Sequence, residues 1–121
     1  MSMPPLPDNS ALDQLVLLER ERPGLMKELI RLFVADAPKQ MRLVCSGYQK
    51  RDPEQVRQAA HFLRSGALAL GLGELAEQTN IVEAMPLEQF GSDASERLVA
   101  GLRSEVHRVL LALLARLREV G

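Results

Sequence analysis

Apolar residues along this chain recur every three or four positions, which is the period of a helix with one buried face. Strict alternation of apolar and polar residues, typical of half-buried strands, is absent. The pattern predicts a short helix from Ala11 to about Arg20, capped by Ser10, and four longer helices after it. We therefore expect an all-α fold, an antiparallel up-down four-helix bundle with a short additional N-terminal helix as a lid.

Prolines set several expected boundaries in the N-terminal half. Residues 1–9 are rich in proline and polar groups and predict a flexible N-terminal arm, which leaves residues 10–121 as a single helical domain. Pro23 suits the first turn of the second helix. Pro38 falls inside that helix and predicts either a kink or a break just before it.

The third helix has the clearest start and stop signals. Asp52 is a favourable N-cap, Pro53 suits the first turn, and Gly71 ends a helix that runs to Leu70. The rest of the chain predicts a fourth helix over 73–85, a loop over 87–93 and a last helix over 94–120.

The third helix also carries the candidate chemistry. Its expected buried stripe consists of Val56, Ala60, Leu63, Ala67 and Leu70. At about 100° per residue, His61 lies about 140° from the centre of this stripe and faces solvent. Arg57 and Arg64 lie one turn to either side on the same surface. An exposed imidazole is a good nucleophile near neutral pH, and neighbouring cations balance the charge that develops during attack on a phosphoryl group.

Small and apolar residues around the histidine predict a surface for another protein. Gly66 and Ala69 remove bulk near His61, and Ser65 places a hydroxyl one turn away. Phe62 and Leu68 are apolar residues on a face that should be polar, so they can form a docking patch. The simpler alternative is an idle surface histidine, with Arg57 pairing only with Glu54 along the helix.

Composition narrows the function classes. The chain has 121 residues and a net charge of -1, which argues against nucleic acid as the main partner. Cys45 is the single cysteine, so an internal disulfide is excluded, and two histidines without a carboxylate set do not define a metal site. Apolar runs stay below the roughly 18 residues of a membrane span, and no signal peptide is evident. We expect a cytoplasmic protein with no membrane insertion.

The segment around the histidine resembles the signature of histidine-containing phosphotransfer (HPt) domains. That signature has an Ala-His pair, a leucine, a lysine, small residues, an alanine and then Leu-Gly. Residues 60–67 read Ala-His-Phe-Leu-Arg-Ser-Gly-Ala and are followed by Leu70 and Gly71. Further features that match the family, over about residues 24–85, are Leu32-Phe33, Ala37-Pro38, Asp52, Leu75 and Glu83.

The resemblance implies a four-helix bundle in which His61 accepts a phosphoryl group from an aspartate of one receiver domain and passes it to another. The implied partners are receiver domains of response regulators or hybrid histidine kinases. The receiver would carry Mg²⁺, so we expect no cofactor on this chain, and we expect a monomer. Arg64 stands where lysine is usual and Ser65 where glycine is usual, departures that bear on partner preference and transfer rate.

Two other assignments compete with this one. The segment from His61 to Ser65 is also similar to the histidine box of kinase dimerisation and phosphotransfer segments, but Phe62 and Gly66 replace the acidic residue and proline usual there. A non-catalytic helical adaptor could bind a partner through Leu68 and Phe62 and leave the histidine idle. An enzyme with its own complete active site is not expected, because no third group that orients His61 is evident from the sequence.

Overall fold

The computed structural model describes residues 17 and 19–120, and every regular element in this part of the chain is helical. The elements are α2 (Leu25–Gln49), α3 (Pro53–Ala69), α4 (Gly73–Glu83), the short 3₁₀ helix η1 (Leu87–Gln89) and α5 (Asp93–Val120). The all-α prediction is confirmed. Residues 17 and 19–21 are helical, whereas the expected arm over 1–9 and the start of the first helix lie outside the described residues.

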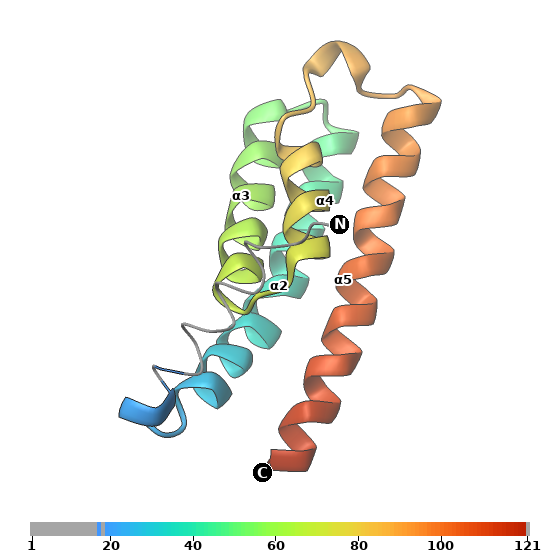
Figure 1. The fold of residues 1–121 in the computed structure, drawn as a ribbon. Helices are drawn as coiled ribbons and strands as arrows, with labels where there is room; N and C mark the ends of the chain where they lie inside the picture. The colour runs from blue at the N-terminus through green and yellow to red at the C-terminus, as the bar shows by residue number, and fades with distance from the viewer. Residues whose placement is uncertain (1–16, 18, 121) are drawn as a thin grey trace, which may run out of the picture.

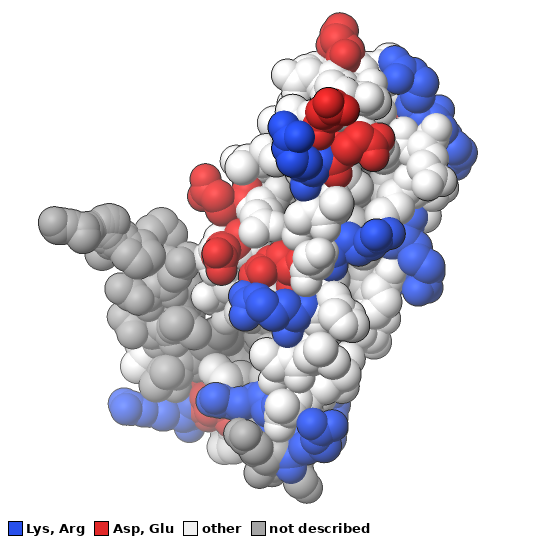
Figure 2. Space-filling view, turned by 90° about the vertical axis from the view of Figure 1, so that its right-hand side faces the viewer, with Lys and Arg blue, Asp and Glu red and all other residues white. Residues whose placement is uncertain are grey.

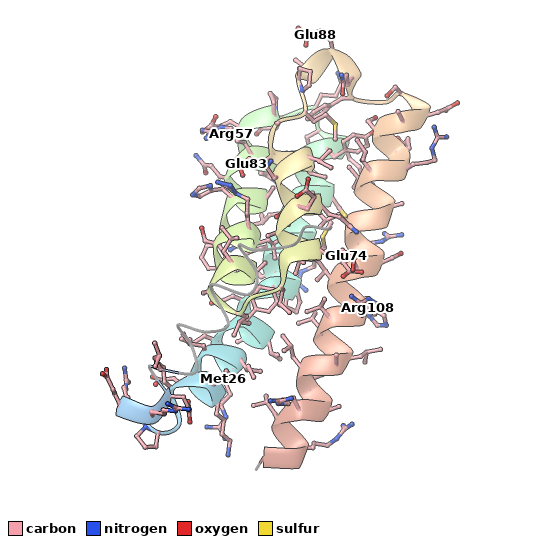
Figure 3. The ribbon with its side chains drawn as sticks, viewed as in Figure 1. Met26, Arg57, Glu74, Glu83, Glu88 and Arg108 are labelled. Atoms are coloured by element: carbon pink, nitrogen blue, oxygen red, sulfur yellow. The ribbon has the colours of Figure 1, made fainter. Side chains whose placement is uncertain are left out.

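The long helices lie side by side in one bundle (Figure 1). α3 packs against α2 and α4, and α5 packs against the same two helices from the other side. Among the largest side chains fully buried in the core are Val44, Val56, Leu63, Leu75, Val82 and Leu102. Arg108 of α5 lies 3.7 Å from Glu74 of α4, an ion pair that joins these two helices at the surface (Figure 3).

α2 runs without interruption through Pro38, so a break there is wrong. The proline removes one intrahelical hydrogen bond, but Phe33, Ala37 and Met41 are buried on either side of it and hold the helix in the core. The helix begins at Leu25, two residues later than Pro23 suggests. Its N-cap Gly24 has a φ of 90°, a left-handed conformation that favours glycine.

Glu19 caps α2 from outside the helix. Its carboxylate accepts hydrogen bonds from the backbone N–H groups of Gly24 and Met26, each at 2.8 Å. These bonds lower the pKa of the Glu19 carboxyl, with the Met26 bond contributing most and the Gly24 bond next. The residues before α2 are thereby tied to its first turn.

α3 begins as its capping signals predict. The Asp52 carboxylate accepts a hydrogen bond from the Gln55 backbone N–H at 3.1 Å, and Pro53 occupies the first turn. The helix ends at Ala69, one residue before the expected Leu70, which is the C-cap, and the next residue, Gly71, has a φ of 71°. α4 ends two residues before the expected Met85, and α5 begins at Asp93, one residue early.

The loop between α4 and α5 is held against the end of α2. The Tyr48 hydroxyl accepts a hydrogen bond from the Gly91 backbone N–H at 2.9 Å and lies 2.5 Å from the Ser95 hydroxyl. Arg51 donates to the Phe90 carbonyl at 3.2 Å. The expected loop over 87–93 therefore contains η1 and is fixed by polar contacts to α2 and to the α2–α3 turn.

Candidate functional site

α3 places His61 on the outer surface of the bundle. Ala60 and Leu63 on either side of it are fully buried, whereas the His61 side chain is 55% exposed. The solvent-facing position that the helical spacing predicts for His61 agrees with the structure. The ring is therefore open to solvent and is carried by a helix that is packed into the bundle.

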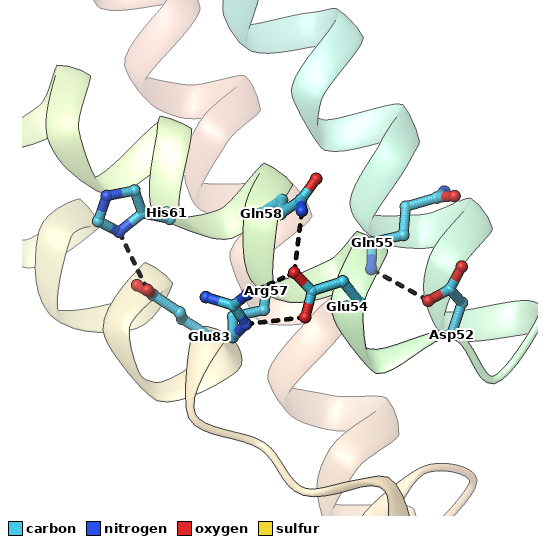
Figure 4. A network of polar contacts seen from close by, with 7 residues as sticks. All are labelled: Asp52, Glu54, Gln55, Arg57, Gln58, His61 and Glu83. Carbon is cyan, nitrogen blue, oxygen red and sulfur yellow. Dashed lines mark hydrogen bonds and ion pairs between the residues drawn. The ribbon is translucent and has the colours of Figure 1, made fainter.

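Glu83 of α4 orients the imidazole. Nδ1 of His61 lies 3.0 Å from Oε2 of Glu83, and the Glu83 side chain is only 17% exposed (Figure 4). A carboxylate only accepts hydrogen bonds, so this contact places a proton on Nδ1. In the neutral ring Nε2 is then the unprotonated nitrogen, and no residue in the described part of the chain bonds to it.

This contact corrects one expectation from the sequence. A third group that orients His61 does exist, and it is a residue that sequence reasoning noted only as a match to the family. Glu83 is 22 residues from His61 and belongs to a different helix. Ser65, whose hydroxyl lies one turn along α3, makes no hydrogen bond to His61 within the described residues. The arrangement is therefore a histidine–carboxylate pair, without the serine of a hydrolytic triad.

Arg64 shares the same carboxylate. Its Nε lies 3.3 Å from Oε1 of Glu83, close enough for an ion pair, yet the two atoms do not have hydrogen-bond geometry. Both atoms are buried and make no other hydrogen bond in the described structure. The Arg64 side chain as a whole is 32% exposed. The Arg64 guanidinium thus lies beside the His61–Glu83 pair, and its Nε makes no hydrogen bond to the shared carboxylate.

Arg57 is engaged elsewhere. It forms two hydrogen bonds with Glu54, one turn back on α3, and Gln58 bonds to the same carboxylate (Figure 4). The Arg57 bond, followed by the Gln58 bond, lowers the pKa of the exposed Glu54 carboxyl. The structure thus shows the helix ion pair that was the simpler alternative for Arg57.

An apolar groove of about 450 Å³ runs between α2 and α3 beside His61. It is lined by Leu29, Leu32, Phe33, Asp36, Gln58, His61, Phe62, Ser65, Gly66, Ala69 and Leu70. Four of the expected partner-binding residues, Phe62, Ser65, Gly66 and Ala69, thus meet the histidine in one groove. Leu68 is 44% exposed but lies outside the groove. The contribution of α2, above all Leu32 at 56% exposed, was missed because it depends on helix packing.

Gly66 allows the two helices of the groove to approach closely. A Cβ atom at this position would lie 2.6 Å from Cδ1 of Phe33, nearer than atoms can pack. The packing of α2 against α3 therefore requires glycine at position 66. The Phe33 ring takes the space that a side chain at Gly66 would fill and forms part of the groove.

Other kinds of site find little support. In the part of the chain that the structure describes, no group of three His, Cys, Asp or Glu residues could hold a metal ion. None of the described helices has the length and apolarity to cross a membrane.

Comparison with known families agrees with this geometry. A family model described as "Hpt domain" matches residues 28–119, which is most of the chain and includes α3, α4 and the histidine–carboxylate pair. Comparison with curated proteins and with solved structures finds no match.

Proposed function

Because this chain belongs to the Hpt domain family, and so has a phosphotransfer role in two-component signalling, we propose that His61 is its phospho-accepting residue. The observation that carries the proposal is the His61–Glu83 contact of 3.0 Å, which leaves Nε2 as the open nitrogen of an exposed ring. His61 would take a phosphoryl group from an aspartate on one receiver domain and pass it to an aspartate on another.

The transfer step follows from this arrangement. The Nε2 lone pair attacks the phosphorus of an aspartyl phosphate, a P–N bond forms, and the P–O bond to the aspartate breaks and leaves its carboxylate. The ring keeps its Nδ1 proton and becomes cationic, and the Glu83 carboxylate balances that charge. Transfer to a second receiver is the reverse step with a new aspartate. Mg²⁺ is expected on the receiver and not on this chain.

Arg64 is the proposed charge support for the phosphoryl oxygens. Its side chain is one turn from His61, and its contact with Glu83 lacks hydrogen-bond geometry. Its planar guanidinium can bind two oxygens through a fixed fork of N–H donors, a geometry that the ammonium group of the lysine usual in the family lacks. Arg57 is a weaker candidate, since it would first have to leave Glu54.

The groove between α2 and α3 is the proposed docking surface for the receiver domain. It combines exposed apolar side chains, such as Leu32 and Phe62, with the small residues Ser65, Gly66 and Ala69 next to the histidine. Leu68, outside the groove, would extend the contact along α3. The fold proposed for this role is an antiparallel up-down bundle that works as a cytoplasmic monomer.

A non-catalytic adaptor is the second candidate, because an apolar groove can bind a partner without any chemistry at His61. The two are separated by incubating the protein with a receiver domain phosphorylated with radiolabelled acetyl phosphate. Label is expected on the wild type and on His107→Gln, the matched loss of the other histidine, but not on His61→Gln. The transferred label should be stable in base and labile in acid, as a phosphohistidine is. Label on His61→Gln would contradict His61 as the accepting residue. Label on no variant, while the receiver still binds, would favour the adaptor.

A kinase dimerisation segment is the remaining alternative. Such a segment should form a dimer. We expect sedimentation equilibrium at micromolar concentration to give the mass of a monomer, which would exclude a dimerisation segment. A stable dimer would contradict the proposed monomer.

A further inference from the structure

A second groove, also of about 450 Å³, lies on the other side of α2 from the His61 groove. It runs between α2 and α5, and its lining on α2 extends from Pro38 to Gln49, about 17 Å along the helix. Buried or half-buried apolar side chains form its floor, including Met41, Val106 and Leu110. None of its lining residues lines the His61 groove, so both grooves can be occupied at the same time.

The rim of this groove is cationic. Arg42 and Arg103 are both exposed lining residues, and neither has an ion-pair partner in the described part of the chain. No carboxylate lines the groove. Two acidic residues of α5 lie near this groove without lining it. Glu105, between Arg103 and Val106 in the sequence, is paired with Arg108, and Glu96 lines only an adjoining smaller hollow and accepts a hydrogen bond from Tyr48.

Arg42 and Arg103 differ in this respect from several other exposed arginines. The chain has 15 Lys and Arg against 16 Asp and Glu, and the exposed arginines Arg22, Arg57 and Arg108 are all paired with carboxylates. Figure 2 shows the α5 side of the molecule, with Lys and Arg along its right-hand edge and most Asp and Glu away from that edge. An apolar floor with unpaired arginines above it is complementary to a ligand that is apolar in the middle and acidic at its edges.

We propose that the α2–α5 groove binds an acidic amphipathic helix of a partner protein. Two helices side by side present ridges and a groove in which a third helix packs, and three turns of a partner helix would fill the length available. Apolar residues spaced three and four apart would lie on the floor, and flanking carboxylates would pair with Arg42 and Arg103. A second copy of this chain is a poor occupant, because a two-fold contact would bring the same arginines together.

Such binding would fix the protein to a partner and leave His61 accessible. A tethered phosphotransfer domain meets its receiver at a raised effective concentration without any new contact at the histidine. The inference does not depend on His61 chemistry, so it can fail or hold independently of the proposed function.

The test uses a fluorescein-labelled synthetic helix with leucines on one face and glutamates on both flanks. Its anisotropy is followed with the full chain, with Arg42→Glu/Arg103→Glu, and with Arg97→Glu. Arg97 is exposed on α5 but outside the groove, so its reversal controls for the effect of a charge change on α5 away from the binding surface. We expect binding to weaken at least tenfold in the double variant and to change less than twofold in Arg97→Glu and in His61→Gln. Circular dichroism should show all variants folded.

Cys45 reports the position of the bound helix. It is the single cysteine of the chain, is half-buried and lines the groove. Saturating peptide should slow the reaction of its thiol with a maleimide at least fivefold. Equal affinity of the double variant, an unprotected Cys45, or equal binding of a peptide with lysine in place of glutamate would overturn the proposal. So would binding of vesicles that contain phosphatidylserine in the absence of peptide binding, because that result would assign the groove to a membrane.

Discussion

Glu83 accepts a hydrogen bond from Nδ1 of His61 at 3.0 Å and at the same time lies 3.3 Å from Nε of Arg64. One carboxylate on α4 therefore serves two groups on α3, a ring that gains positive charge on phosphorylation and a cation that can turn to the phosphoryl oxygens. This shared carboxylate decides what substitutions at the site should do.

Glu83→Gln is expected to slow phosphoryl transfer to His61 by about tenfold, equivalent to about 1.4 kcal/mol in the barrier. The amide oxygen can still accept from Nδ1, but it does not carry the charge that balances the phosphorylated ring. The measurement is the single-turnover rate with a phosphorylated receiver. Glu74→Gln, a neutralisation on the same helix at an exposed position, is the control and should transfer at the wild-type rate.

Arg64→Ala should slow transfer by about tenfold or more and lower the stability of the bundle by no more than about 1 kcal/mol. The stability change is small because the contact with Glu83 lacks hydrogen-bond geometry and the side chain is partly exposed. Urea denaturation and the transfer rate are measured on the same preparation. Arg64→Lys, which keeps the charge, should recover most of the rate, and a lysine variant as slow as the alanine variant would argue against charge support.

Gly66→Ala should destabilise the protein by about 1–2 kcal/mol, because the added methyl group would press on the Phe33 ring. Gly101→Ala is the matched control, since a Cβ there has nothing within 4 Å and α5 continues through it. That control should stabilise by about 0.5–1 kcal/mol through helix propensity alone. Thermal and urea unfolding of both variants give the comparison, and a stabilised Gly66→Ala would mean that α2 and α3 pack less closely than described.

Arg57→Ala should raise the pKa of Glu54 towards its ordinary value, because the Arg57 bond is the main cause of its lowering. A carboxyl whose pKa is lowered by folding favours the native state above its unfolded pKa, and this contribution disappears as the pH falls through the folded pKa. The variant should therefore lose slightly less stability than wild type on acidification. NMR titration of the Glu54 side chain follows the pKa directly, and an unchanged value would show that the ion pair does not form in solution.

Most of the fold follows from signals that are local in the sequence. The period of apolar residues predicts the helices, and Asp52 with Pro53 predicts the start of α3 because an N-cap involves only neighbouring residues. The exposure of His61 follows from the same period. Pro38 does not break α2, because core contacts on both sides of it offset the free energy lost with one helical hydrogen bond. Those contacts come from other helices and cannot be predicted from the sequence of α2 alone.

The parts of the site that the sequence does not predict depend on how the helices pack. The register of α3 against α4 decides whether Glu83 reaches His61, and the distance between α2 and α3 decides whether Leu32 and Phe33 form a groove with it. For Arg57 the sequence leaves two arrangements open, because the same helical spacing places it one turn from His61 and one turn from Glu54. In the structure its guanidinium bonds to Glu54.

The bonds from Glu19 to the first turn of α2 bear on how the protein can be shortened. The family match begins at residue 28, so truncation at that boundary would remove the glutamate, Gly24 and the opening turn together. The helix would then begin at a frayed end next to Ile30 and Phe33, and fraying there would loosen the wall beside the histidine. Truncated forms intended for structural or kinetic work should retain the chain from at least residue 19.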